Sequence, residues 1–191
     1  ALVASTVKVA DPLQAVGDPT TSVAAMRACW ALGDALRGGT ASMRAAKTTY
    51  LPQEPGESND SYDLRLRRSF LFNAYGDTVL HLAAKPFART VKLGSSGVFE
   101  PWTTDVDLEG STLTAFARAV FEDAIDHGLT HILVDFPLTG GTLSLGEERD
   151  LGVRPFFVHV PASAVLGWRT TRFRGREVLT QLRIEERASL P

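Results

Sequence analysis

The residues best suited to chemistry in this 191-residue sequence are two histidines and an aspartate, His127, His131 and Asp135. Histidine and aspartate together can ligate a metal ion or supply the base of a hydrolase. Two histidines four residues apart meet on one helix face, but Gly128 is expected to end the helix between them. On a strand, His131 and Asp135 would point the same way but lie about 13 Å apart at about 3.3 Å per residue. This spacing predicts no shared metal ion.

A second set of oxygen ligands lies in residues 105–110, where Asp105, Asp107 and Glu109 alternate before Gly110. A calcium-binding EF-hand loop begins with this pattern, but its twelfth position needs a bidentate carboxylate. Phe116 stands at that position. We therefore predict a solvated acidic turn that leads into a helix.

Motifs for nucleophilic catalysis and phosphate binding are not found. The sequence has neither a G-x-S-x-G elbow nor a G-K-[ST] motif. Cys29 is the single cysteine, and its place on the apolar side of an expected helix predicts a buried, inert thiol. Gly140-Gly141 follows an expected strand, but no helix is predicted after it, as a phosphate loop would require. We predict a protein that is not an enzyme and has no catalytic residue, cofactor or metal ion.

Charge is the most uneven property of the sequence. Residues 154–187 hold seven arginines and three glutamates, a net charge of +4, whereas the whole chain carries −2 and the remainder therefore −6. Arg172, Arg174 and Arg176 surround an expected hairpin turn. This tip is predicted to contact a neighbouring subunit or DNA. The alternative is a solvated hairpin whose arginines prevent edge-to-edge pairing of strands.

Length and composition restrict the class of protein. Hydrophobic residues make up 44% and charged residues 22% of the chain, which is typical of a globular domain. The slightly negative net charge argues against a protein that coats nucleic acid. No apolar run approaches the about 20 residues that cross a bilayer, and one cysteine cannot form an internal disulfide. We expect a soluble protein of a reducing compartment, processed or part of a longer product because it begins at Ala1.

The elements that would position these residues divide the chain into three parts. Residues 1–20 are predicted to form an irregular arm because they show no sustained period and contain two Asp-Pro pairs. Residues 21–87 are predicted to be a helical region. Its expected helices cover 21–36, a short stretch after Thr40, a stretch after Ser58, and 73–84.

Residues 88–191 are predicted to form an α+β region. Its clearest helix covers 111–126, and its strands are expected at 88–93, 130–136, 155–160, 165–171 and 177–186. The nearly continuous apolar run of 130–136 predicts a strand buried on both faces, and Arg174-Gly175 is the expected turn between the last two strands. The predicted fold class is α+β, with a helical N-terminal part followed by a helix packed on a mainly antiparallel sheet.

A series of short motifs runs through residues 30–187. The series is Tyr50-Leu51-Pro52, Gly56-Glu57-Ser58, Tyr62 with Arg65-Leu66, Phe72-Asn73-Ala74, Thr78-Val79, Lys85-Pro86, Gly110-Ser111, Leu113 with Phe116-Ala117, Gly128, Ile132-Leu133-Val134-Asp135-Phe136-Pro137, Arg154-Pro155, Val160-Pro161-Ala162 and Trp168-Arg169. In order and spacing it resembles a family of tailed-bacteriophage portal proteins that was long catalogued as a phage domain of unknown function.

The resemblance implies a viral structural protein. Portal proteins form rings, typically of twelve subunits, at one capsid vertex, and double-stranded DNA passes through the central channel without sequence-specific binding. The ring contacts the capsid protein, the packaging motor and later the head–tail adaptor proteins. This chain would then be a homo-oligomeric virion component, assembled in the host cytoplasm and without a membrane partner. Its residues would form the N-terminal wing-like part that leads toward the stem and clip.

Two other functions remain as alternatives. A head–tail adaptor or connector that binds such a ring would be complete near this length, whereas portal subunits are longer. A small hydrolase would use His127 or His131 with Asp135, and two of these side chains would have to lie within about 3 Å of each other.

Overall fold

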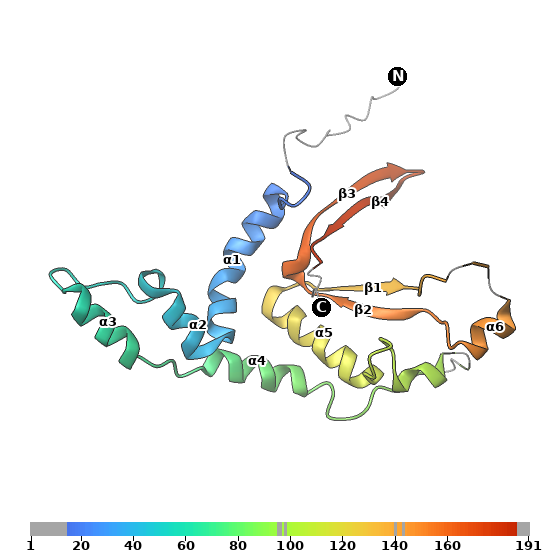
Figure 1. The fold of residues 1–191 in the computed structure, drawn as a ribbon, viewed down its shortest axis with the longest axis horizontal. Coiled ribbons are helices and arrows are strands. Elements are labelled where there is room, and N and C mark those ends of the chain that lie inside the picture. Colours follow the sequence, from blue (N-terminus) through green and yellow to red (C-terminus); the bar gives the residue numbers. More distant parts are fainter. Residues whose placement is uncertain (1–14, 95–96, 98, 140, 143, 187–191) are drawn as a thin grey trace, which may run out of the picture. The chain divides into compact units, whose positions relative to one another are not determined.

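The computed structural model describes residues 15–94, 97, 99–139, 141–142 and 144–186, which form six α-helices and four β-strands (Figure 1). The helices are α1 (Thr21–Arg37), α2 (Gly39–Ala45), α3 (Asn59–Arg68), α4 (Ala74–Ala84), α5 (Leu113–His127) and α6 (Leu145–Asp150). The strands are β1 (His131–Asp135), β2 (Phe156–Val160), β3 (Val165–Phe173) and β4 (Arg176–Ile184). The predicted α+β class is confirmed. Among the described residues, no helix has the length and apolar character needed to cross a membrane.

The chain divides into two compact units. The smaller unit comprises residues 1–29 and 163–191, and the larger comprises residues 30–162, so the boundary falls within α1. The three-part division expected from the sequence stays a prediction. The first fourteen residues of its N-terminal arm lie outside the described residues.

Helix ends follow the capping residues in the sequence. Asn73 precedes α4 and its Oδ1 accepts the Gly76 N–H at 2.9 Å, while Thr112 caps α5 in the same way. Gly128 ends α5 with a φ of 75°, the left-handed conformation predicted for it. The predicted helices are confirmed, with two changes at their starts. α2 begins at Gly39, so Thr40 lies inside it and does not precede it. α5 begins two residues later than expected because Thr112, not Ser111, precedes its first turn.

Residues 88–93 do not form the predicted strand. A strand needs a neighbour for its backbone groups, and here the Val91 N–H donates instead to the Thr114 hydroxyl at 3.0 Å. No helix was predicted after Gly140-Gly141, but α6 follows at Leu145–Asp150. Ser144 and Glu147 form a capping box at its start. Gly140 itself lies outside the described residues.

Two separate antiparallel pairs replace the single sheet that we expected. In the larger unit, β1 pairs with β2 from His131 opposite Val160 to Asp135 opposite Phe156. Because the structure shows no third strand beside this pair in the described residues, β1 is not buried on both faces as predicted. Ile132 is 50% exposed and Val134 is 61% exposed.

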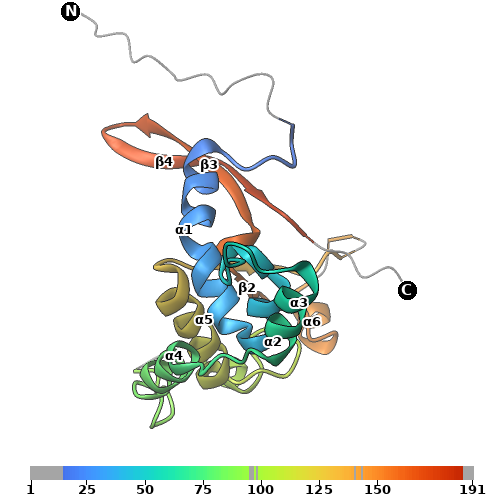
Figure 2. The ribbon, with the colours of Figure 1, turned by 90° about the vertical axis from the view of Figure 1, so that its left-hand side faces the viewer.

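In the smaller unit, β3 and β4 form a long two-stranded ribbon (Figure 2). Arg174 and Gly175 have φ values of 49° and 79°, the positive angles of a type I′ hairpin turn, so the predicted turn is confirmed. The Thr20 N–H donates to the Leu166 carbonyl at 2.8 Å. A Cβ at Gly167 would lie 2.4 Å from Cγ2 of Thr20, so this approach requires glycine.

The core of the larger unit lies between α4, α5 and β2. α4 packs against α5, and the buried apolar side chains include Val79, Ala83, Phe116 and Val160. The ring centre of Phe157 on β2 lies 5.9 Å from that of Phe116 on α5. This packing positions α5, whose last turns carry most of the charged side chains described next.

Candidate functional site

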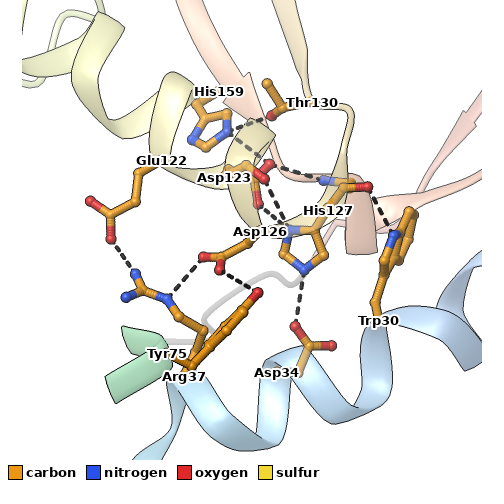
Figure 3. Close-up of polar contacts among 11 residues, drawn as sticks. Trp30, Asp34, Arg37, Tyr75, Glu122, Asp123, Asp126, His127, Thr130 and His159 are labelled. Atoms are coloured by element: carbon orange, nitrogen blue, oxygen red, sulfur yellow. Dashed lines mark hydrogen bonds and ion pairs between the residues drawn. The ribbon is translucent and has the colours of Figure 1, made fainter. Parts of the chain in front are cut away.

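The densest group of charged side chains surrounds the C-terminal half of α5 (Figure 3). Residues four apart share a helix face, so α5 presents two adjacent pairs, which are Glu122 with Asp126 and Asp123 with His127. Facing side chains come from α1 at positions one turn apart, and these are Trp30, Asp34 and Arg37. We call these seven residues, together with Tyr75, Thr130 and His159, the α1–α5 polar network.

His127 is held between two carboxylates. Its Nδ1 lies 2.8 Å from Oδ1 of Asp123, and its Nε2 lies 2.9 Å from Oδ1 of Asp34. The indole N–H of Trp30 donates to the His127 carbonyl at 2.9 Å, and the two rings meet edge to face. Partial burial lowers the pKa of His127, but the hydrogen bond with Asp34 and the charges of Asp123 and Asp34 outweigh it and raise this pKa above 6.5.

Asp123 joins α5 to the end of β2. Besides His127, its carboxylate contacts Nε2 of His159 at 3.4 Å and accepts the Ala162 N–H at 3.3 Å. The Asp123 side chain is 12% exposed. A largely buried carboxylate with three donors links secondary-structure elements, because each donor would otherwise be left without a partner.

Arg37 joins α1, α4 and α5. Its guanidinium forms ion pairs with Glu122 and with Asp126, where Nε lies 2.9 Å from Oδ2, and it also donates to the Gly76 carbonyl. The Tyr75 hydroxyl donates to Oδ1 of Asp126 at 3.1 Å. Burial and the hydrogen bond to this carboxylate raise the pKa of Tyr75, so the phenol stays protonated as a donor.

This arrangement does not favour proton transfer by either histidine. Both ring nitrogens of His127 lie within 2.9 Å of carboxylate oxygens of the same chain, so neither is open to a substrate. For His159, both the Thr130 hydroxyl at 2.9 Å and the Asp123 carboxylate approach the same nitrogen, Nε2. A catalytic triad needs these partners on opposite ring nitrogens. The network instead ties α1, α4, α5 and β2 together.

The structure separates the residues that the sequence suggested for a metal or hydrolase site. His127 ends α5, while His131 and Asp135 lie at opposite ends of β1. Nδ1 of His131 is buried and has no hydrogen-bond partner among the described residues, and Asp135 accepts the N–H of Phe136. No group of three or more histidine, cysteine or acidic side chains in this part of the chain could hold a metal ion.

One partner of His127 could have been predicted from the sequence, and the other could not. Asp123 precedes His127 by four residues on a predicted helix, so the i, i+4 spacing could have identified this pair. Asp34 is 93 residues away, and no local pattern connects it with His127.

The acidic turn at residues 105–110 uses its carboxylates to hold its own backbone. Oδ1 of Asp107 accepts the N–H groups of Glu109 and Ser111, each at 3.0 Å, and Asp105 pairs with Arg154 at 3.1 Å. Burial raises the pKa of Asp107, but the hydrogen bonds from Ser111 and Glu109 outweigh it and lower the pKa to about 2. The predicted turn before a helix is confirmed.

The predicted contact residues Arg172, Arg174 and Arg176 surround the β3–β4 turn and are exposed. The Arg174 guanidinium carbon lies 5.2 Å from the ring centre of Phe173. Within the described residues, none of these three arginines forms an ion pair with an acidic side chain. Their charges are therefore available to a partner, although the predicted contact itself stays a prediction.

Cys29 is exposed on α1, so the predicted burial of its thiol is wrong. The buried residue of α1 is Val23, and Cys29, six residues later, does not share its helix face.

No family model matches this sequence, and no curated protein matches it either.

Proposed function

We propose that this chain is a structural subunit of a bacteriophage portal ring, which forms the conduit for the genome at a capsid vertex. The motif series supports this proposal, and the observation that carries it is the amount of apolar surface left open. Among the described residues, twenty-two large apolar side chains are exposed, whereas ten apolar side chains are buried. A protein with so little core and so much open apolar surface needs partners to cover it.

The open apolar side chains are concentrated in three places. On β1 and just after it they are Ile132, Leu133, Val134, Phe136 and Leu138. On the β3–β4 ribbon they are Trp168, Phe173, Val178, Leu179 and Leu182. Between α3 and α4 they are Phe70 and Phe72, which are 81% and 79% exposed. Isolated two-stranded ribbons are marginally stable in water, so the strand surfaces in particular favour covering by other chains.

A ring of identical subunits meets this need because every copy offers the same surfaces to its neighbours. In the proposed assembly about twelve copies form the ring, and capsid protein, packaging motor and head–tail adaptor proteins bind its outer surfaces. Double-stranded DNA passes through the channel without sequence-specific contacts. The ring is assembled in the host cytoplasm and remains in the virion.

Both histidines of the α1–α5 polar network already contact side chains of the same chain. These contacts favour the structural role over hydrolysis. His127 lies between Asp34 and Asp123, and the two partners of His159 share one nitrogen. In this proposal the protein is not an enzyme. The head–tail adaptor remains a runner-up, and no contact of the described residues favours it over the ring subunit.

Electron microscopy of the native particle formed by the complete gene product tests the proposal. The expected result, after rotational averaging, is a closed ring of about twelve copies around a hole as wide as a DNA duplex. A monomer or a small dimer would contradict it. An adaptor would be distinguished by binding to a preformed ring without forming one alone.

A further inference from the structure

A groove opens on the larger unit between α5 and β2. Its volume is about 390 Å³, within the range of about 300–1,000 Å³ that is usual for ligand-binding pockets. It lies entirely within residues 107–159, so its shape depends on one compact unit. Its lining combines three features that suit one type of occupant.

The first feature is an aromatic wall. Phe116, Phe156 and Phe157 line the groove, and His159 lies at the same wall. The ring centres of Phe116 and Phe157 are 5.9 Å apart, and those of Phe116 and His159 are 6.5 Å apart. Aromatic faces attract guanidinium groups, which stack on them with part of their hydration shell removed.

The second feature is the space along α5. Ala115 and Ala119, one turn apart and both exposed, line this side of the groove. Their small side chains leave room beside the phenylalanines, which a longer residue would fill. The groove can therefore admit a side chain or a narrow hairpin tip.

The third feature is negative charge. Asp107 and Glu109 line the groove. The Asp107 carboxylate accepts hydrogen bonds from the backbone N–H groups of Glu109 and Ser111, which keep it ionised. The Glu109 carboxylate has no ion-pair partner among the described residues. The larger unit as a whole contains twelve basic and seventeen acidic residues, a net charge of −5. An arginine-bearing occupant fits both the acidic and the aromatic parts of the lining.

The same chain carries such an occupant. Residues 165–184, which form the β3–β4 hairpin, hold five arginines and one glutamate, a net charge of +4. The turn presents Arg172, Arg174 and Arg176 without acidic partners in the described residues, and Phe173 beside them is 59% exposed. A tip with unpaired guanidinium groups and an open aromatic ring is complementary to an acidic groove with aromatic lining.

We propose that the β3–β4 hairpin tip of one copy docks in the α5–β2 groove of a neighbouring copy. This inference deepens the proposed function and rests on it, because it names a contact between adjacent subunits. The contact is heterologous: each copy uses its tip on one neighbour and its groove on the other. Repetition of such a contact closes a ring when the rotation permits. DNA is disfavoured as the partner of the tip because phosphates offer no aromatic wall and the chain is slightly acidic.

Charge reversal on each side of the contact provides the test. The tip variant carries Arg172→Glu, Arg174→Glu and Arg176→Glu, and the groove variant carries Glu109→Arg. In the complete gene product, the tip variant places glutamates opposite Asp107 and Glu109, and the groove variant places an arginine opposite the tip arginines at position 109. We therefore expect ring formation by either variant alone to need at least about tenfold more protein. When the two variants are mixed, every tip meets a side chain of opposite charge at position 109, so alternating rings should form at a lower concentration than with either variant alone.

Matched controls separate this contact from general charge effects. Arg67→Glu and Asp60→Lys reverse exposed charges on α3, which contributes no residue to the groove lining, and should leave ring formation unchanged. Ala119→Trp, which fills the groove without a change of charge, should weaken it. Recovery of the ring in the mixture also shows that both variants fold, since an unfolded variant could not restore assembly.

Four results would overturn the inference. Rings that form normally from the tip variant alone would remove the contact while the proposed function stands. A mixture that fails to restore rings would do the same. Loss of DNA binding by the tip variant with unchanged rings would assign the arginines to DNA instead. If the wild-type protein forms no ring, the proposed function fails together with the inference.

Discussion

The α1–α5 polar network and the β3–β4 hairpin use the same residue types for opposite purposes. In the network, Arg37 and His127 each contact two carboxylates of the same chain. At the hairpin tip, Arg172, Arg174 and Arg176 contact none within the described residues. Charges that are paired internally hold elements together, whereas charges left unpaired on an exposed ribbon are available to other molecules. This contrast indicates which substitutions should affect folding and which should affect assembly.

The largest effect on stability is expected from Asp123→Ala. This change removes the acceptor of His127, His159 and the Ala162 N–H. It should lower the free energy of unfolding by about 2–4 kcal/mol, because partly buried donors lose their partner. Urea titration of the purified protein measures this value. Asp135→Ala, which removes an exposed carboxylate on β1, is the control and should cost less than about 0.5 kcal/mol. Equal losses in the two variants would show that the network does not stabilise the fold.

Arg37→Met should have the next largest effect. It removes ion pairs with Glu122 and Asp126 but keeps most of the apolar stem, so we expect a loss of about 1–3 kcal/mol. A double-mutant cycle with Asp126→Asn, measured by urea unfolding, should give a coupling energy of about 1 kcal/mol. Arg118→Met serves as the exposed control. A coupling energy near zero would contradict a direct contribution of this pair.

The dependence of stability on pH tests the contribution of His127 to the polar network. The folded-state pKa of His127 is raised above its ordinary 6.5, so the stabilisation is fully present below the unfolded-state pKa and disappears as the pH rises through the folded-state pKa. The groups that face His127 are Asp34 and the indole of Trp30 from α1 and Asp123 from α5. His127→Gln should remove this decrease in the free energy of unfolding, which begins as the pH rises above about 6.5. The same decrease in wild type and variant would mean that another group titrates.

The smallest effect on the fold is expected from reversal of the hairpin tip. Replacement of Arg172, Arg174 and Arg176 by glutamate should change the unfolding free energy of the unassembled chain by less than about 0.5 kcal/mol, because no internal ion pair is lost. Urea unfolding at a protein concentration below that of assembly measures this change. A loss as large as that of Arg37→Met would show that the tip arginines support the fold, and the contrast between the two regions would fail.

Local signals in the sequence predicted much of the secondary structure. Asn73 and Gly128 mark helix ends because capping involves groups only a few residues apart, and Arg174-Gly175 marks a turn for the same reason. The capping box of Ser144 and Glu147 is an equally local pattern that could have predicted α6. The pairing and burial of the strands could not be predicted because they depend on residues far away in the sequence. An apolar run predicts a strand, but the number of strands beside it decides its burial.

In the candidate site, too, contacts between residues close in sequence could be predicted and contacts between distant residues could not. The pair Asp123 and His127 follows from helical spacing, and the unpaired arginines follow from their density around a turn. The partners Asp34 and Arg37 come from α1, more than eighty residues away in sequence, so only the fold brings them to α5. The exposure of Cys29 was mispredicted because a helical period does not define how wide the covered side of a helix is.

Native mass spectrometry of the complete gene product, over a series of protein concentrations, tests the central claim most directly. A structural ring subunit should give one dominant species of about twelve chains, with few intermediates, because a closed ring satisfies every tip and groove at once. A mass that stays at one or two chains throughout the series would contradict the account.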